Sequence, residues 1–169
     1  MKNNKIVHAV TVSESLIFLK NYAQHMRDND IEYIVSCNPD SDAENWCKQE
    51  KVVFLPVSMV RVPSLLNDLK SLYQCIRKLH IIKPLIVNAG TPKAGLIFML
   101  SAWFLRVPYR IYHVRGYRHE SLSGIKKRIQ IFIERLCGVL ATDILMESQS
   151  LKDFAVQGHL FSSKKMFSI

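Results

Sequence analysis

Two short polar stretches carry side chains that can bind an anion, and each follows an apolar run typical of a buried strand. Asn88, Thr91 and Lys93 come directly after the run 85–87. The junction also carries the signals of a helix start, because Thr91 can act as an N-cap and Pro92 suits the first helical position. The first turn of a helix leaves backbone N–H groups unpaired, and these attract anions. We therefore expect an anion site here, with Lys93 adding its charge.

The second stretch follows the run 109–114 and is richer in charge. Its candidate site residues are Arg115, Gly116, Arg118, His119 and Glu120. An arginine offers a bidentate fork to phosphate oxygens. Cations at two adjacent strand ends thus favour a phosphate-bearing ligand. The competing interpretation is that both stretches are ordinary exposed loops.

The elements around these stretches predict how they are brought together. Strands are expected at 5–12, 31–36, 52–55, 85–87, 109–114 and 144–146, with a last one beginning near 164, and helices at 16–28, 42–50, after Ser64, at 92–106, 125–140 and 149–155. Strands that alternate with helices predict an α/β fold, a Rossmann-like doubly wound parallel sheet with helices on both faces, in one domain.

Ligands of such sheets bind at the carboxyl ends of the strands, near the switch in strand order. The loops after the first, fourth and fifth strands should all lie on that edge. The first loop adds Thr11, Ser13 and Glu14 to the candidate site.

Several familiar sites are missing from the sequence. It has no GxGxxG, no GxxxxGK[ST] and no GxSxG, so the dinucleotide, P-loop and nucleophile-elbow interpretations lack their key residues. The four cysteines form no CxxC pair, and we expect them to be reduced and buried. His8 lies in an apolar strand and is expected to be a core residue, while His113 and His119 lack ligand partners at metal-binding spacing. No metal and no cofactor is predicted, and no catalytic residue is assigned.

A formal net charge of +9 favours phosphates, anionic lipid headgroups or nucleic acid as partners. The basic residues are dispersed and lack interleaved aromatics, so nucleic acid is not expected. Lys126, Lys127 and Arg128 cluster at a helix start, where cations are unfavourable. They either point into water or face an anionic surface.

Two helices raise the question of which face is buried. The helix 92–106 is apolar nearly all round, so it is either buried or docked on a membrane or partner through residues such as Trp103 and Phe104. The expected core stripe of the helix 125–140 consists of Ile125, Ile129, Phe132, Ile133 and Leu136.

The sequence also carries signals about the cell compartment of the protein and about whether the chain is part of a longer one. No signal peptide precedes the first strand, and the longest apolar run, 94–105, is shorter than the roughly 20 residues of a membrane span. We expect a cytoplasmic protein. The chain stops inside the apolar run 164–169, as a part of something longer would.

Five blocks of residues together resemble the amino-terminal half of family 4 glycosyltransferases, most closely those that build bacterial capsule, O-antigen and exopolysaccharide. The blocks are Met59–Leu69, Thr91–Leu96 (Thr-Pro-Lys-Ala-Gly-Leu), Arg106–Tyr112 followed by Gly116, Glu134-Arg135, and Ser148–Leu151. The family often has His-Thr-His where this chain has Asn88-Ala89-Gly90, and His-Gly where it has Arg115-Gly116. Arg115 cannot act as a base near neutral pH, but it can bind phosphate.

The resemblance implies a function and a location. It implies half of a GT-B fold: residues 1–169 as the acceptor-binding domain, with the donor-binding domain absent. The whole enzyme would be a retaining, metal-independent transferase that moves a sugar from a nucleotide-sugar to a lipid-linked or glycan acceptor, at the cytoplasmic face of the membrane with peripheral contact to anionic lipid. The fragment alone is expected to be inactive. The alternative is a stand-alone, non-catalytic α/β module that binds an anion or a protein partner through the same edge.

Overall fold

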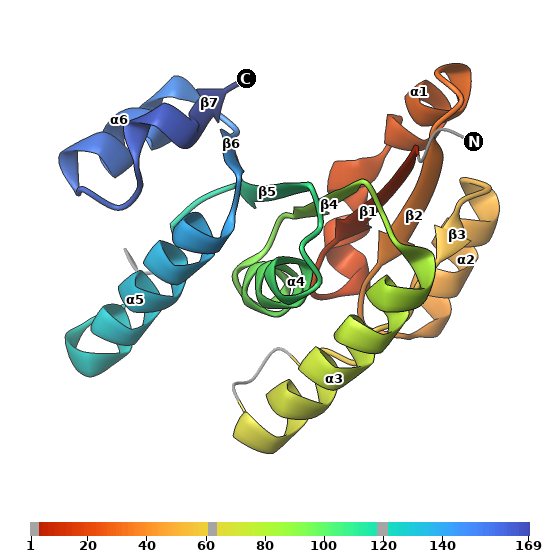
Figure 1. Cartoon of the computed structure of the whole chain (residues 1–169), viewed down its shortest axis with the longest axis horizontal. Helices are drawn as coiled ribbons and strands as arrows, with labels where there is room; N and C mark the ends of the chain where they lie inside the picture. Colours follow the sequence, from red (N-terminus) through yellow and green to blue (C-terminus); the bar gives the residue numbers. More distant parts are fainter. Residues whose placement is uncertain (1–3, 61–63, 118–121) are drawn as a thin grey trace.

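Seven parallel strands form one sheet at the centre of the computed structural model, which describes residues 4–60, 64–117 and 122–169 (Figure 1). The strands are β1 (Lys5–Ala9), β2 (Glu32–Ser36), β3 (Val53–Phe54), β4 (Ile86–Ala89), β5 (Tyr109–Val114), β6 (Asp143–Met146) and β7 (Met166–Ser168). Their order is β3-β2-β1-β4-β5-β6-β7, with every neighbouring pair parallel. The order reverses between β1 and β4, which confirms the predicted doubly wound sheet.

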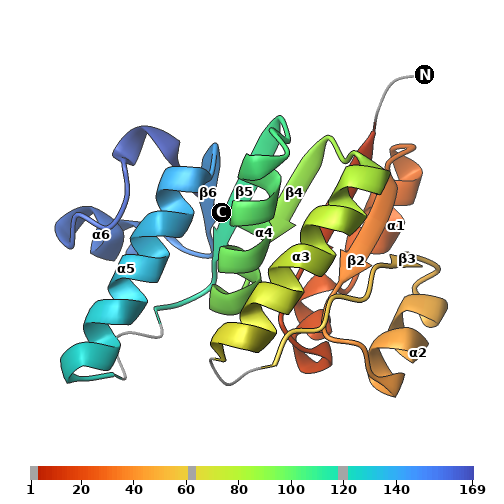
Figure 2. The same ribbon diagram turned by 60° about the horizontal axis from the view of Figure 1, so that its bottom comes forward.

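Helices cover both faces of this sheet, as predicted. On one face lie α3 (Leu65–Ile82), α4 (Pro92–Phe104) and α5 (Gly124–Leu140), with α4 in the middle (Figure 2). The opposite face of β1 and β2 is packed by the 3-10 helix η1 (Ser13–Leu19), α1 (Tyr22–Asp28) and α2 (Ser41–Gln49). The chain then continues through α6 (Gln149–Gln157) and the short 3-10 helix η3 (Ser163–Lys165) to β7.

Alternating side chains on the strands feed two separate cores. Val7 and Ala9 of β1 point to the side of α3, α4 and α5 and are completely buried there. Tyr33 and Val35 of β2 join the smaller core under η1, α1 and α2. Because each face has its own helical layer, the strands are apolar on both sides, as buried parallel strands usually are.

Close packing fixes α4 against the sheet. A Cβ atom on Gly95 would lie 2.5 Å from Cε2 of Tyr112 in β5, so only glycine allows this approach. Seven residues of α4 are buried, including Phe98 and Met99, which confirms that this helix belongs to the core. Trp103 and Phe104, at its carboxyl end, are the exposed exceptions.

The structure corrects two predictions about helices. The predicted helix 16–28 is two elements, η1 and α1, because Asn21 between them adopts a left-handed φ of 73°. The predicted core stripe of α5 is also wrong in part: Ile125, Ile129 and Phe132 are exposed, and the buried residues of this helix are Glu134, Cys137, Gly138 and Leu140. The other two predicted residues, Ile133 and Leu136, are partly buried and pack against the core, so apolar residues lie on both the inner and the outer side of this helix.

All four cysteines, Cys37, Cys47, Cys75 and Cys137, are buried and free, as predicted. Within the described ranges, no helix combines the length and apolarity that crossing a membrane requires.

Candidate functional site

The carboxyl ends of β1, β4, β5 and β6 meet at one edge of the sheet, and polar side chains gather there. Thr11, after β1, lies with its hydroxyl 2.6 Å from that of Thr91, after β4. The backbone N–H of Ala94 in the first turn of α4 also points to the Thr11 hydroxyl, at 3.4 Å. Thr91 occupies the N-cap position without making a side-chain cap bond. Thr11, in the loop after β1, therefore caps α4 in place of Thr91. This contact also brings the candidate residues after β1 and after β4 together.

Arg115, after β5, is held from three sides. Its guanidinium lies 4.7 Å from the ring centre of Phe18 in η1, and its Nη1 atom lies 3.5 Å from Oε1 of Glu147, which follows β6. A third neighbour is His113, whose Nδ1 atom is 3.4 Å from Nη2 of Arg115. The side chain is only 12% exposed. Arg115 thus connects the loops after β1, β5 and β6.

A glycine makes room for this arginine. A Cβ atom at Gly90 would lie 3.0 Å from Nε of Arg115, closer than most such contacts. The glycosyltransferase family that this chain resembles often has histidine at positions 90 and 115. The two departures from its pattern therefore occur at residues that contact each other.

Two buried histidines lie beneath Arg115, on the same face of the sheet. The rings of His8 and His113 are 6.5 Å apart between centroids. Nδ1 of His8 is 2.9 Å from the hydroxyl of Tyr33, and Nε2 of His113 is 3.1 Å from Glu147 Oε1, although not aligned as a hydrogen bond. Burial, helped by the charge of Arg115, lowers the pKa of His8 to about 3 and that of His113 to about 4. Both rings are therefore neutral at pH 7.

Unpaired polar atoms concentrate in this cluster. Asn88, at the end of β4, lies beside His8 in the sheet register, and its Oδ1 atom is buried. In the described part of the chain, five buried side-chain N or O atoms have no hydrogen-bond partner, and four of them belong to His8, Asn88, His113 and Arg115. Buried polar groups are nearly always paired, so such a concentration is typical of a functional site or of bound water.

Lys93 lies on the same edge but points toward α3. Its Nζ atom is 2.7 Å from Oδ1 of Asp68 and donates to the backbone carbonyl of Val60. The side chain is 15% exposed. An anion that binds Lys93 must therefore compete with Asp68.

Ser13 and Glu14 lie to one side of this cluster. The hydroxyl of Ser13 donates to Asp40 at 2.8 Å, and Glu14 is exposed. Both line an open hollow of about 420 Å³ between η1 and α2. Its charged lining is mainly acidic, with Glu14, Asp42 and Glu50 beside a single lysine. This side of the edge is a poor place for a phosphate.

The remaining candidates divide into one placed residue and three that are not described. Gly116 is open: nothing lies within 4 Å of a Cβ atom built there, so a larger residue would fit. Arg118, His119 and Glu120 lie outside the described residues. In the ranges that are described, no three His, Cys, Asp or Glu side chains come together as a metal site would require.

Three partners were missed by reasoning from the sequence. Glu147 directly follows the sixth strand, so the strand-end rule that located Arg115 could have located it too. Phe18 gave no such signal because it stands in a stretch that looks like the apolar face of a helix. Asp68 and Lys93 are 25 residues apart, and no local pattern connects them.

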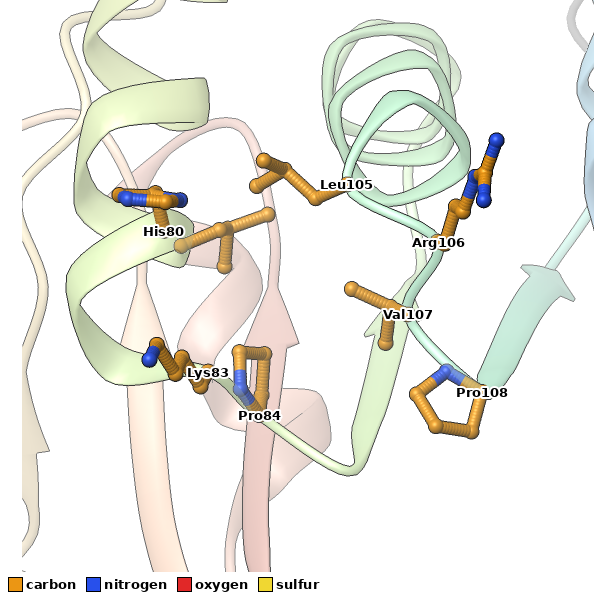
Figure 3. Close-up of a pocket in the computed structure, with 8 residues that line it drawn as sticks. His80, Lys83, Pro84, Leu105, Arg106, Val107 and Pro108 are labelled. Carbon is orange, nitrogen blue, oxygen red and sulfur yellow. The ribbon is translucent and has the colours of Figure 1, made fainter.

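A second pocket, of about 310 Å³, lies at the opposite end of the strands (Figure 3). It is lined by the end of α3, including His80, by Lys83 and Pro84 directly after this helix, and by the turn 105–108 before β5. Ligands of doubly wound sheets bind at the carboxyl edge, so this pocket is not the candidate site.

The chemistry of the carboxyl edge follows from these contacts. Arg115 supplies a partly buried cation, while Thr11, Thr91 and Asn88 supply hydroxyl and amide groups next to it. The neutral histidines can donate or accept one hydrogen bond each. This set suits a ligand that combines an anionic group with hydroxyl groups.

Comparison with known proteins finds a relative that matches nearly the whole chain. The chain is 38% identical over 167 residues to the capsular polysaccharide biosynthesis glycosyltransferase CapM of Staphylococcus aureus, a match that covers 98% of this chain and 43% of CapM. No family model matches the sequence.

Solved structures establish the fold. Anabaena HepE, determined in complex with UDP and glucose, superposes with a TM-score of 0.75 at 15% identity, over 97% of this chain and 43% of HepE. The UDP-GlcNAc 2-epimerase of Neisseria meningitidis, bound to UDP-GlcNAc, gives a TM-score of 0.69 at 14% identity, over 97% of this chain and 46% of the epimerase. This chain spans less than half the length of each of these proteins, and its fold is that of one Rossmann-like half of a GT-B structure.

Proposed function

We propose that this chain is the acceptor-binding half of a glycosyltransferase for surface polysaccharide. The reaction is the transfer of a sugar from a nucleotide-sugar to a lipid-linked or glycan acceptor. The observation that carries the proposal is the 38% identity to CapM along 98% of the chain. Fold likeness alone would not suffice, because a UDP-GlcNAc 2-epimerase shares the fold.

The proposed enzyme is retaining and metal-independent and acts in the cytoplasm, at the inner face of the membrane. In such a reaction the transferred sugar leaves a phosphate group, whose growing negative charge must be stabilised. Arg115 is the cation best placed for this, because it lies at the strand-end edge and is shielded from water. We assign it to a phosphate oxygen, with Asn88 and Thr91 orienting sugar hydroxyls and Lys93 as a second cation.

Binding of a phosphate by Arg115 would replace an existing contact. Glu147 now neutralises the guanidinium at 3.5 Å, but its own side chain is 42% exposed. A carboxylate that is this exposed can turn into solvent, and the phosphate would then take its place beside the guanidinium. Phe18 would continue to hold the guanidinium from its other side.

The test is sugar transfer by the protein as its gene encodes it, with labelled nucleotide-sugars, UDP-glucose first, and lipid extracts of the native membrane. Arg115→Gln should lower transfer roughly 10- to 150-fold, the value of a hydrogen bond to a charged group. Lys48→Gln, a charge removed from the exposed side of α2, is the matched control and should leave transfer unchanged.

Three outcomes would contradict the proposal. If the Arg115→Gln variant transferred sugar as fast as the unchanged protein, Arg115 would not bind the phosphate as assigned. Conversion of the nucleotide-sugar to an epimer without any acceptor would indicate epimerase chemistry instead. Absence of both reactions, with an anionic ligand still bound at the edge, would favour the non-catalytic module. The 169-residue chain by itself is expected to transfer no sugar.

A further inference from the structure

Glu147 has a backbone that the fold holds in place and a side chain that has room to turn. It directly follows β6, and its backbone N–H donates to the carbonyl of Val114 at the end of β5, at 3.3 Å. The next residue, Ser148, caps α6 by accepting from the backbone N–H of Leu151, also at 3.3 Å. The side chain of Glu147 is 42% exposed, whereas that of Arg115 beside it is only 12% exposed. Glu147 is therefore fixed at the strand-end edge, while its carboxylate can change its direction.

His113 can hold one oxygen of this carboxylate. Arginine only donates hydrogen bonds, so Nδ1 of His113, at 3.4 Å from Nη2 of Arg115, must be the ring atom that accepts. The ring is neutral at pH 7, so its single proton is then on Nε2. This atom faces Oε1 of Glu147 at 3.1 Å. A small turn of the carboxylate would align this contact and leave its other oxygen free for a substrate.

The proposed reaction brings the acceptor hydroxyl next to Glu147. A retaining transfer is either two inversions through a nucleophile on the face opposite the phosphate, or one displacement on the same face. Glu147 lies 3.5 Å from Arg115, which is assigned to the phosphate, so it stands on the phosphate side and is badly placed as that nucleophile. In a displacement on the same face, the acceptor hydroxyl and the departing phosphate oxygen share one space. That space adjoins both Arg115 and Glu147.

We propose that Glu147 is the general base of the transfer and accepts the proton of the acceptor hydroxyl. The hydroxyl oxygen forms a bond to the anomeric carbon of the sugar, the bond from that carbon to the phosphate oxygen breaks, and the phosphate keeps its electron pair. Arg115 stabilises the charge that develops on the phosphate. The proton then passes from Glu147 to water, which the exposure of its side chain allows. This proposal rests on the proposed function and adds the residue that takes the proton.

The other groups described at this edge are worse proton acceptors. His8 is 1% exposed and His113 is 2% exposed, so an acceptor cannot reach their rings. Burial also lowers the pKa of His8 to about 3 and that of His113 to about 4, which makes both weak bases. Asp68 is paired with Lys93 at 2.7 Å. The phosphate oxygen that Arg115 binds is itself a poor base, because the guanidinium stabilises its negative charge.

Binding of the phosphate prepares Glu147 for this role. The phosphate takes the place beside the guanidinium that the carboxylate now occupies at 3.5 Å, so Glu147 loses a cationic partner and gains an anionic neighbour. Both changes favour the protonated form of a carboxyl group. The carboxylate therefore accepts a proton more readily when the nucleotide-sugar is in place.

The experiment compares Glu147→Gln with the unchanged protein, both as the gene encodes them, on the nucleotide-sugar that supports transfer. Glu147→Gln should lower kcat on the order of 100-fold or more, the usual contribution of a general base. The same variant should bind inorganic pyrophosphate up to about fivefold more tightly in calorimetry, because Arg115 loses a competing carboxylate. Slower turnover together with tighter anion binding separates a base from a residue that only supports the fold.

Formate provides a second readout that a structural role would not give. In Glu147→Ala, formate can take the place of the missing carboxylate, so its addition should raise kcat several-fold in this variant and leave the unchanged protein as it is. Glu44→Gln, which removes an exposed carboxylate from α2, is the matched control and should match the unchanged protein in transfer and in pyrophosphate binding. Circular dichroism should show all variants folded.

Each contrary outcome has its own meaning. Unchanged kcat in Glu147→Gln, where Arg115→Gln still slows transfer, would overturn this proposal and leave the proposed function standing. A loss of kcat that formate does not restore, without tighter pyrophosphate binding, would show that Glu147 only supports Arg115. A covalent adduct of the sugar on Glu147, detected by mass spectrometry, would make it a nucleophile instead. If no nucleotide-sugar supports transfer, the proposed function fails and this proposal fails with it.

Discussion

Acid should destabilise this protein through two buried histidines, His8 and His113. Burial lowers the pKa of His8 to about 3, and burial together with Arg115 lowers that of His113 to about 4. In the unfolded chain both return to about 6.5. Between pH 6.5 and 4 the unfolded state therefore binds up to two more protons than the folded state, and stability must fall as the pH falls.

The size of the effect follows from these pKa values. At pH 5 an unfolded histidine is almost fully protonated, whereas His113 in the folded protein is about one-tenth protonated. Each histidine then costs about 2 kcal/mol of unfolding free energy relative to pH 7.5, or about 4 kcal/mol for the pair. Domains of this kind are stable by only about 5–15 kcal/mol, so the loss would be easy to measure.

The assay is urea unfolding, followed by tryptophan fluorescence, at half-unit steps from pH 5 to 8. Asparagine can imitate the Nδ1 atom of histidine, so His8→Asn and His113→Asn retain that contact without the titration. The double variant should be less stable at pH 7.5 but should lose about 4 kcal/mol less on acidification. His25→Asn, at an exposed position in α1, is the control and should keep the full pH dependence.

Two results would refute the reasoning. One is an unchanged pH dependence in the double variant. The other is a direct NMR titration in which the rings of His8 and His113 gain their protons near pH 6.5 while the protein remains folded. Either would mean that the cluster below Arg115 is open to water.

Three further predictions concern packing at the site. Gly95→Ala should cost about 1–3 kcal/mol in urea unfolding, because its Cβ atom would lie 2.5 Å from a buried ring, whereas Gly116→Ala, with open space around it, should be neutral. Thr11→Val should cost about 1 kcal/mol in the same assay, since it removes the hydroxyl that caps α4; a neutral result would contradict the cap. Gly90→Ala should lower the free energy of unfolding less in a protein that also carries Arg115→His than in one that keeps Arg115. If the effects of the two substitutions simply add, the two residues do not interact.

The sheet was predictable because its signals are local. Each strand is a short apolar run closed by polar or turn residues, and the bounds of β5 were predicted to the residue. The rule that strand ends share an edge also placed Thr11, Asn88, Thr91 and Arg115 together. These conclusions need only the order of the elements and the direction of the strands.

The faces and partners of the helices were harder to predict. The apolar period of α5 is real, but a period does not say whether the stripe meets the sheet or faces outward. Ile129 and Phe132 were therefore assigned to the core wrongly. The partners of Lys93 and Arg115 are non-local too, because Glu147 stands 32 residues after Arg115 and meets it only once β5 and β6 are paired.

Gly90 and Arg115 both depart from the family's pattern of histidines, and one steric constraint explains both departures. A histidine at position 90 would occupy the space that the guanidinium now fills, since even a methyl group would approach Nε to 3.0 Å. Conversely, Arg115 reaches Phe18 and Glu147 because it is long and because position 90 is empty of side chain. The charge that a histidine would carry only when protonated is here permanent. If the edge binds phosphate, it therefore does so across the physiological pH range, and the neutral histidines below contribute hydrogen bonds and no charge.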